Sequence, residues 1–277
     1  MIKTVLITGA NSGIGLATAQ MCLQNNYRII ACVRELKKGQ ALEEFAQTIN
    51  ATGNLFFVEM DISSGQSVFK AFRAIEKKKL SIDVLINNAG FGLFGELENL
   101  SVEDLKNQFE TNLFGTHRLI QQILPQMRTR NSGIIINMSS ISGKVTFPYF
   151  GAYASSKFAL EGYTQTLWGE LFKTNIRVYL VEPGPVETDF YRNVHVSKNR
   201  SQKKIDREEY SFLARLQKRV KVGSRSNPNI IAETVIRLIE GDSKKLRHPA
   251  GFLAGILLFL QKLLPDQLFL RLIQALY

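Results

Sequence analysis

The sequence predicts an α/β fold in which a doubly wound parallel sheet forms one domain over residues 1–277. Three observations predict it. Six short apolar runs alternate with segments long enough for a helix, which is the pattern of βαβ units. The first run ends in a glycine-rich turn that opens directly into a helix-like segment. Hydrophobic residues make up 45% of the chain and charged residues 21%, enough apolar surface for one large core.

The strands and helices follow in order along the chain. The expected strands are residues 4–7, 28–33, 55–60, 84–86, 133–138 and 177–181. The expected helices are residues 14–25, 36–49, 64–78, 102–128 and 153–172. In the last helix, apolar residues from Ala159 to Leu171 return at helical spacing, so that segment should bury one face. With helices between parallel strands, both faces of the sheet should be covered.

The last third of the chain differs in composition. Residues 190–228 are polar and basic, with an amphipathic pattern that predicts a helix around 210–220. Residues 229–277 are expected to be helical, with breaks at Pro249 and Pro265. The part from 249 to 277 is an apolar tail, too apolar to face water on all sides.

The net charge of +11 is unevenly placed. Residues 1–190 carry 18 basic and 17 acidic side chains, whereas residues 191–277 carry 17 and 7. Residues 192–225 alone hold 11 basic side chains against three acidic ones, so an anionic partner would bind there; a solvated loop is the simpler interpretation.

The sequence gives no support for a disulfide framework or a metal site. The two cysteines, Cys22 and Cys32, fall in an expected helix and an expected strand, and the three histidines have no ligand partners at metal spacing. No signal peptide is visible, and the apolar run 249–260 is too short to cross a bilayer. We therefore expect a cytoplasmic protein, with peripheral membrane contact through the tail as an open alternative.

The turn after the first strand has the context that a pyrophosphate site requires. It reads Thr8-Gly9-Ala10-Asn11-Ser12-Gly13-Ile14-Gly15 and leads directly into a helix. Glycines allow the backbone to turn sharply and approach phosphates, while the free N–H groups and the helix dipole favour negative charge. An ordinary tight turn would show the same spacing, so the motif alone is weak evidence.

A second constellation combines two hydroxyls and an amine. Tyr153 and Lys157 are four residues apart, which places them on one helical face, and Ser140 lies just beyond the strand 133–138. A phenol with a pKa near ~10 is a poor acid at neutral pH, but a nearby cation can lower that pKa by ~1–3 units. The pattern therefore predicts that Tyr153 is a usable proton donor.

Seven markers in order resemble those of the short-chain dehydrogenases/reductases, over about residues 3–190. They are Thr8-Gly9-x-x-x-Gly13-x-Gly15, Asp61-Ile62, Asn87-Asn88-Ala89-Gly90, Asn112, Ser140, Tyr153-x-x-x-Lys157 and Pro183-Gly184-x-x-x-Thr188. The resemblance implies a Rossmann fold and an oxidoreductase that passes a hydride between a nicotinamide and a substrate carbon. The hydroxysteroid and retinol dehydrogenase branches are the nearest in pattern.

The resemblance also implies a role for each catalytic position. Tyr153 would be the general acid/base, and Lys157 would lower its pKa and hold the nicotinamide ribose. Ser140 would hydrogen-bond the substrate oxygen, while Asn112 would bend its helix and anchor a water of the proton relay. The residues implied to bind the cofactor are Gly9, Asn11, Ser12, Gly13, Ile14, Gly15, Arg34, Asp61, Ile62, Asn88, Ala89, Gly90, Tyr153, Lys157, Pro183, Gly184, Val186 and Thr188.

The choice of cofactor depends on the end of the second strand. NAD-using members place an acidic residue at the position of Val33, whereas here Val33 is apolar and Arg34 follows. Arg34 and Ser12 would contact a ribose 2′-phosphate, so we expect NADP rather than NAD. Glu35 leaves NAD open, because it could fold back onto the ribose.

The expected substrate is a bulky apolar ketone or alcohol, such as a steroid-like, retinoid-like or long-chain acyl compound. The apolar tail and the aromatic residues Phe91, Phe94, Phe147, Tyr149 and Phe150, with Leu93, predict an apolar pocket. The resemblance also implies that the segment after the sixth strand covers the substrate, so residues 190–228 would form a substrate loop and the tail 249–277 a helical substrate lid. Packing of the tail on the domain or on a second subunit is the simpler interpretation, and contact with a membrane is a further alternative.

Two other function classes remain for comparison. A non-catalytic NADP sensor would not need Tyr153 and Lys157 together, and a nucleic-acid-binding protein would need base-stacking aromatics that the basic segment lacks. We therefore expect an enzyme with no nucleic-acid partner. The helices 102–128 and 153–172 resemble those that pair in the family, which predicts a homodimer or homotetramer.

Overall fold

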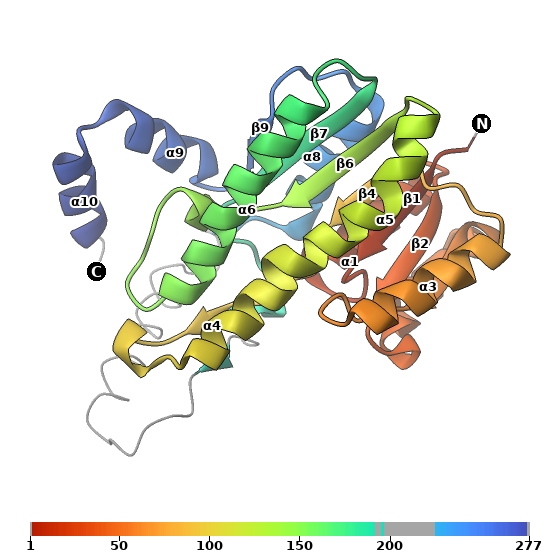
Figure 1. Cartoon of the computed structure of the whole chain (residues 1–277), viewed down its shortest axis with the longest axis horizontal. Coiled ribbons are helices and arrows are strands. Elements are labelled where there is room, and N and C mark those ends of the chain that lie inside the picture. Colours follow the sequence, from red (N-terminus) through yellow and green to blue (C-terminus); the bar gives the residue numbers. More distant parts are fainter. Residues whose placement is uncertain (1, 192–194, 197–224, 276–277) are drawn as a thin grey trace.

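In the computed structural model, which describes residues 2–191, 195–196 and 225–275, seven parallel strands form the central sheet (Figure 1). The strand order is β3-β2-β1-β4-β6-β7-β9. The strands are β1 (Thr4–Thr8), β2 (Arg28–Val33), β3 (Leu55–Glu59), β4 (Val84–Asn87), β6 (Gly133–Met138), β7 (Ile176–Pro183) and β9 (Arg247–Ala250). Because the order reverses beside β1, the sheet is doubly wound as the sequence predicts.

Helices cover both faces of the sheet (Figure 1). On one face lie α1 (Gly13–Gln24), α2 (Gln40–Thr48) and α8 (Pro228–Glu240), and on the other lie α3 (Gly65–Lys77), α5 (Thr116–Thr129) and α6 (Gly151–Glu170). Val5 and Ile7 join the first core while Leu6 joins the second. The strands are continuous apolar runs because alternate side chains are buried on opposite faces.

The predicted helix 102–128 is divided in two. It consists of α4 (Val102–Phe109), a π-helical turn at Glu110–Gly115 and α5. Ser101 begins α4 with a capping box, in which its hydroxyl accepts from the Asp104 N–H and the Asp104 carboxylate accepts from the Ser101 N–H. A π turn inserts an extra residue in the helix and changes the direction of the side chains that follow.

Short elements complete the described part of the chain. Strand β5 (Leu93–Phe94) pairs in parallel with β8 (His195–Val196), which ties the segment after β7 to the segment after β4. Single 3-10 turns are found at Leu36–Gly39, Thr52–Asn54, Leu97–Asn99, Ile141–Gly143 and Asp189–Tyr191.

The prediction that residues 229–277 are helical is wrong in one segment. Strand β9 pairs with β7, and Pro249 lies opposite Glu182 in that ladder instead of breaking a helix. A proline is compatible with this position because β9 is an edge strand, so one side of its backbone needs no N–H donor. The break at Pro265 is confirmed, since it separates α9 (Ala254–Leu263) from α10 (Asp266–Gln274).

The two C-terminal helices lie beyond β9, at the edge of the molecule (Figure 1). Leu257, Phe269 and Ile273 pack in one apolar cluster with Ile141 and Val145, which follow β6. The helices therefore cover that segment. The helix predicted around 210–220, like most of the basic segment 192–225, lies outside the described residues. No described helix combines the length and the apolar character needed to cross a bilayer.

Candidate active site

A cleft of about 1330 Å³ opens at the carboxyl ends of the strands. This volume exceeds the ~300–1,000 Å³ of most small-molecule sites, so the cleft has room for a dinucleotide and a second molecule. Its walls include Ser140 and every residue that the resemblance implies to bind the cofactor. Among the predicted site residues, Asn112 alone does not line it.

The glycine turn between β1 and α1 forms one end of the cleft. Gly9 and Gly13 have φ values of +66° and +53°, which favour glycine. A Cβ on Gly15 would lie 2.1 Å from the Gly9 carbonyl oxygen, so this position admits no side chain. The Ser12 side chain makes no capping hydrogen bond to α1. The first N–H groups of α1 thus lack a side-chain cap, which suits a phosphate at the helix N-terminus.

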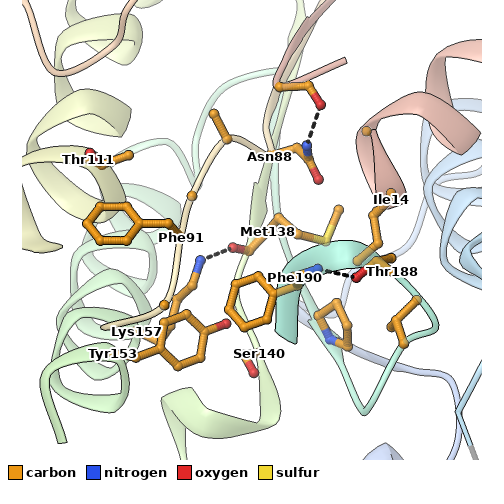
Figure 2. A pocket seen from close by; sticks show the side chains of 18 of the residues that line it. Ile14, Asn88, Phe91, Thr111, Met138, Ser140, Tyr153, Lys157, Thr188 and Phe190 are labelled. Carbon is orange, nitrogen blue, oxygen red and sulfur yellow. Dashed lines mark hydrogen bonds between the residues drawn. The ribbon is translucent and has the colours of Figure 1, made fainter. Parts of the chain in front are cut away.

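Asn88 fixes the turn to the neighbouring strand. Its side-chain Nδ2 donates to the Thr8 carbonyl over 2.9 Å (Figure 2), and the backbone N–H groups of Asn88 and Ala89 both donate to Thr8 Oγ1 over 3.0 Å. These bonds hold the ends of β1 and β4 together at the point where the strand order reverses. They leave the surface of the turn open to a ligand.

Lys157, Tyr153 and Ser140 gather at the other end of the cleft (Figure 2). The Lys157 ammonium donates to the Met138 carbonyl over 2.8 Å and lies 5.8 Å from the centre of the Tyr153 ring. Lys157 is 5% exposed. Its burial lowers the pKa of the amine to about 8, although the negative charge of Glu161 opposes the shift. The pKa of Lys157 therefore lies close to neutral pH, and the amine lies beside the phenol of Tyr153.

The Ser140 side chain begins the 3-10 turn Ile141–Gly143 by accepting from the Ser142 N–H over 3.1 Å. This bond fixes the hydroxyl oxygen at the end of β6. The neighbouring candidates differ, because Ser139 is buried and Ser142 contributes its backbone. Ser139 and Ser142 also line the cleft, however, so the lining alone does not choose among the three.

Asn112 lies in the π-helical turn, behind the cleft wall. Its Oδ1 accepts from the Phe91 N–H over 3.2 Å, and its Nδ2 donates to the Phe91 carbonyl over 3.1 Å and to Ser156 Oγ over 3.0 Å. Both ends of the amide are thus used to hold the segment after β4 against α6. The π turn provides the bend that the resemblance implies at this residue.

Aromatic and aliphatic side chains surround Tyr153. Its ring centre lies 5.3 Å from that of Phe190 and 6.3 Å from that of Phe150. Of the residues predicted to form an apolar pocket, Phe91, Phe147 and Phe150 line the cleft, together with Leu253 and Leu257 of the tail. Leu93, Phe94 and Tyr149 do not, and the prediction is wrong for them: Leu93 and Phe94 are buried behind the wall.

The part of the cleft beside the end of β2 is basic. Arg34 and Lys38 both line it. The sequence analysis missed Lys38 because it lies within the 3-10 turn Leu36–Gly39, whose direction the sequence does not show. Glu35 forms ion pairs with Lys38 at 2.5 Å and Lys37 at 2.9 Å. Hydrogen bonds from these two ammonium groups lower the pKa of Glu35 to about 2. The Glu35 carboxylate, which could otherwise have bound the ribose of NAD, is thus already engaged in ion pairs.

Two buried carboxylates lie behind the turn that carries Ser140. Glu161 accepts from Arg247 Nε over 2.8 Å, and Glu182 lies 4.0 Å from the same nitrogen. Burial and the charge of Glu161 raise the pKa of Glu182 to about 7, while Arg247 and Lys144 oppose the shift. The Glu161 Cγ would be 2.9 Å from a Cβ on Gly143, so Glu161 packs closely against the turn that follows Ser140.

The described residues hold no group of three or more His, Cys, Asp or Glu side chains that could bind a metal ion. The side chains of Tyr153, Lys157 and Ser140 in the cleft can transfer protons and form hydrogen bonds.

Comparisons with known proteins agree with this arrangement. A sequence profile of the family described as short chain dehydrogenase matches residues 3–199. Human retinol dehydrogenase 8 is 41% identical over 192 residues, which are 68% of this chain and 60% of that protein. A 3-ketodihydrosphingosine reductase of Bacteroides thetaiotaomicron is 33% identical over 96% of this chain and 94% of its own.

Solved structures show the same fold. A short-chain dehydrogenase from Streptomyces avermitilis superposes with a TM-score of 0.81 at 27% identity, covering 94% of both chains. An alcohol dehydrogenase from Thermococcus sibiricus, solved with 5-hydroxy-NADP, gives a TM-score of 0.73 at 25% identity, covering 91% of this chain and 97% of its own. The glycine turn, the Tyr153–Lys157 pair and these matches lead to one conclusion: the chain belongs to the short-chain dehydrogenase/reductase family.

Proposed function

We propose that this protein is an NADP-dependent oxidoreductase that interconverts a carbonyl and an alcohol on a bulky apolar substrate. The observation that carries the proposal is the placement of Tyr153, Lys157 and Ser140 in one cleft with an uncapped glycine turn. The chain matches only 60% of the length of retinol dehydrogenase 8, so its activity is inferred from its own site.

The residues fit a dinucleotide. The glycine turn would hold the pyrophosphate, because Gly15 leaves no room for a side chain and the first turn of α1 lacks a side-chain cap. Arg34 and Lys38 favour NADP over NAD, since they bring two positive charges to the end of β2 while Glu35 is engaged in ion pairs. A bound nicotinamide would supply or accept the hydride.

The protein's own groups move the proton. During reduction, Ser140 would donate a hydrogen bond to the substrate carbonyl and Tyr153 would give its phenolic proton to the oxygen, so that the product is an alcohol. The Lys157 ammonium favours the phenolate that remains, because a nearby positive charge lowers the pKa of a phenol. Asn112 would support the relay indirectly, by holding the Phe91 backbone.

The apolar walls favour a bulky apolar substrate. Phe150 and Phe190 lie against Tyr153, and Leu253 and Leu257 close the same end of the cleft. The names of two relatives, a retinol dehydrogenase and a 3-ketodihydrosphingosine reductase, refer to apolar substrates and support this class.

The test is a matrix of NADPH and NADH against ketones of graded length and polarity. We expect turnover with NADPH and long apolar ketones, and turnover of small polar ketones alone would refute the substrate class. Tyr153→Phe should lower the rate by about 10²–10⁴-fold and leave NADPH affinity, measured by fluorescence titration, within about threefold. Equal activity in this variant would refute the proton transfer.

We also propose a cytoplasmic homodimer or homotetramer. Phe114 and Phe158 are large exposed apolar side chains on the helical segments expected to pair, which supports the assembly. Both cysteines are buried free thiols, which supports a reducing compartment such as the cytoplasm. Light scattering coupled to size-exclusion chromatography would measure the mass, and a monomer at micromolar concentration would contradict the assembly.

A further inference from the structure

The outward side of α9 carries a stripe of large apolar side chains. Ile256, Phe259 and Leu263 are spaced by three and four residues, so they share one side of the helix, and the exposed Phe252 lies just before it; these four residues are here called the outer stripe. Their exposed fractions are 46%, 61%, 63% and 64%. Eight of the 17 exposed large hydrophobic residues in the described part of the chain fall between positions 252 and 272. Such a concentration marks an interaction surface.

The same helix faces the cleft with its other side. Leu257 is 8% exposed and lines the cleft, as does Leu253, the residue that precedes α9. The helix is therefore apolar on both sides, with the wall of a pocket on one and the molecular surface on the other. Packing within the described chain explains only the inner side.

Positive charges accompany the outer stripe. Lys262 lies on α9 one turn after Phe259, and Arg271 lies on α10, between the exposed Leu270 and Leu272 in the sequence. Neither cation forms an ion pair among the described residues, and Asp266 is the one acidic residue between 252 and 275. An apolar stripe with adjacent cations is the pattern of helices that lie in a lipid–water interface.

We propose that the outer stripe and the adjacent Lys262 and Arg271 bind the surface of an anionic lipid bilayer. The stripe would enter the boundary of the acyl chains and the cations would contact lipid phosphates. A second copy of the chain fits less well, because a self-interface would bury two cations per copy with Asp266 as the nearest acidic group in sequence.

This surface would place the apolar end of the cleft at the membrane. Leu253 and Leu257 link the cleft to the helix that touches lipid, so an apolar substrate could pass between bilayer and cleft without crossing water. That consequence rests on the proposed function, whereas lipid binding itself does not.

The experiment is flotation of the full-length protein with vesicles, without substrate. Vesicles of phosphatidylcholine are compared with vesicles in which about a third of the lipid is phosphatidylserine, over a series of salt concentrations. We expect binding to the anionic vesicles that weakens with salt. Ile256→Ser with Phe259→Ser should weaken binding by about tenfold for each side chain, and Lys262→Glu by at least about fivefold.

The control is Phe69→Ser, because Phe69 is 60% exposed on α3, at the opposite edge of the sheet from α9. It should bind vesicles as the unchanged protein does. Thermal unfolding checks that each variant is folded. If the double variant does not fold, the vesicle binding of Lys262→Glu tests the proposal instead. The proposal fails if the protein does not float with anionic vesicles, or if Phe69→Ser reduces binding as much as the double variant. It also fails if the stripe variants convert an oligomer to a monomer without affecting flotation.

Discussion

Replacing Lys157 by methionine should abolish activity and yet stabilise the fold. The buried ammonium has a pKa of about 8 against an ordinary 10.5, and at ~1.36 kcal/mol per unit the charged form destabilises the folded protein by about 3 kcal/mol. Methionine has a similar length and no charge, but it forfeits the hydrogen bond to the Met138 carbonyl, about 1 kcal/mol. The expected net gain at pH 7 is about 2 kcal/mol, or roughly 4–8 °C in Tm.

The pH dependence separates this cause from ordinary repacking. Because the folded pKa of Lys157 lies below the unfolded one, the folded state binds fewer protons between pH 8 and 10.5. The penalty is complete below pH 8, and the unchanged protein gains stability as the pH rises through that window. Lys157→Met should not gain it, so the advantage of the variant should shrink and change sign near about pH 10, leaving the variant about 1 kcal/mol less stable once the penalty is gone.

The assay is urea unfolding, followed by circular dichroism, of protein freed of nucleotide. The free energy is compared at pH 7 and at steps up to pH 10.5. A less stable Lys157→Met protein at pH 7, or a constant difference between the two proteins across the window, would refute the reasoning. Stabilisation with loss of activity would show that Lys157 is kept for function against its effect on folding.

Three further predictions concern the turn, the cofactor and the buried carboxylates. Gly15→Ala should destabilise the protein by about 1–3 kcal/mol and weaken NADPH binding, because its Cβ would meet the Gly9 carbonyl. The control is Gly53→Ala, where a Cβ would have no atom within 4 Å, and it should change stability by less than about 0.5 kcal/mol in the same urea assay. Arg34→Glu should raise the KM for NADPH more than about tenfold and leave that for NADH nearly unchanged, and steady-state kinetics with equal effects on both would contradict a 2′-phosphate contact. Glu182→Gln should be more stable than the unchanged protein at pH 8 by about 1–3 kcal/mol. The folded pKa of Glu182 is about 7 against an ordinary 4.5, so the unchanged protein loses stability as the pH rises between those values. A variant that shows the same loss would exclude Glu182 as its source.

The sequence predicted the parts of the site that depend on local backbone chemistry. The glycine turn, the end of β4 and the Tyr153–Lys157 pair are each set by residues within a few positions of one another, and all of them line the cleft. The six predicted strands are also confirmed. They could be predicted because runs such as 29–33 are buried on both faces and are therefore apolar throughout.

The rest depends on contacts between distant segments. Strand β9 contains Arg247, His248 and Pro249, which do not resemble a strand, and it forms because β7 offers a free edge. The π turn around Asn112 has no residue signature, since it reflects the bonds from Asn112 to Phe91 and Ser156. Phe190 reaches Tyr153 because the chain after β7 returns over Gly92, which no local pattern indicates.

That return has a consequence for the selectivity of the cleft. A Cβ on Gly92 would lie 2.9 Å from Cζ of Phe190, so the absence of a side chain at position 92 lets the Phe190 ring settle close to the phenol of Tyr153. The shape of the cleft beside Tyr153 is thereby governed from behind, by a residue that need not touch the substrate. A larger residue at position 92 would displace the Phe190 ring and change that shape while leaving every proton-transferring group in place.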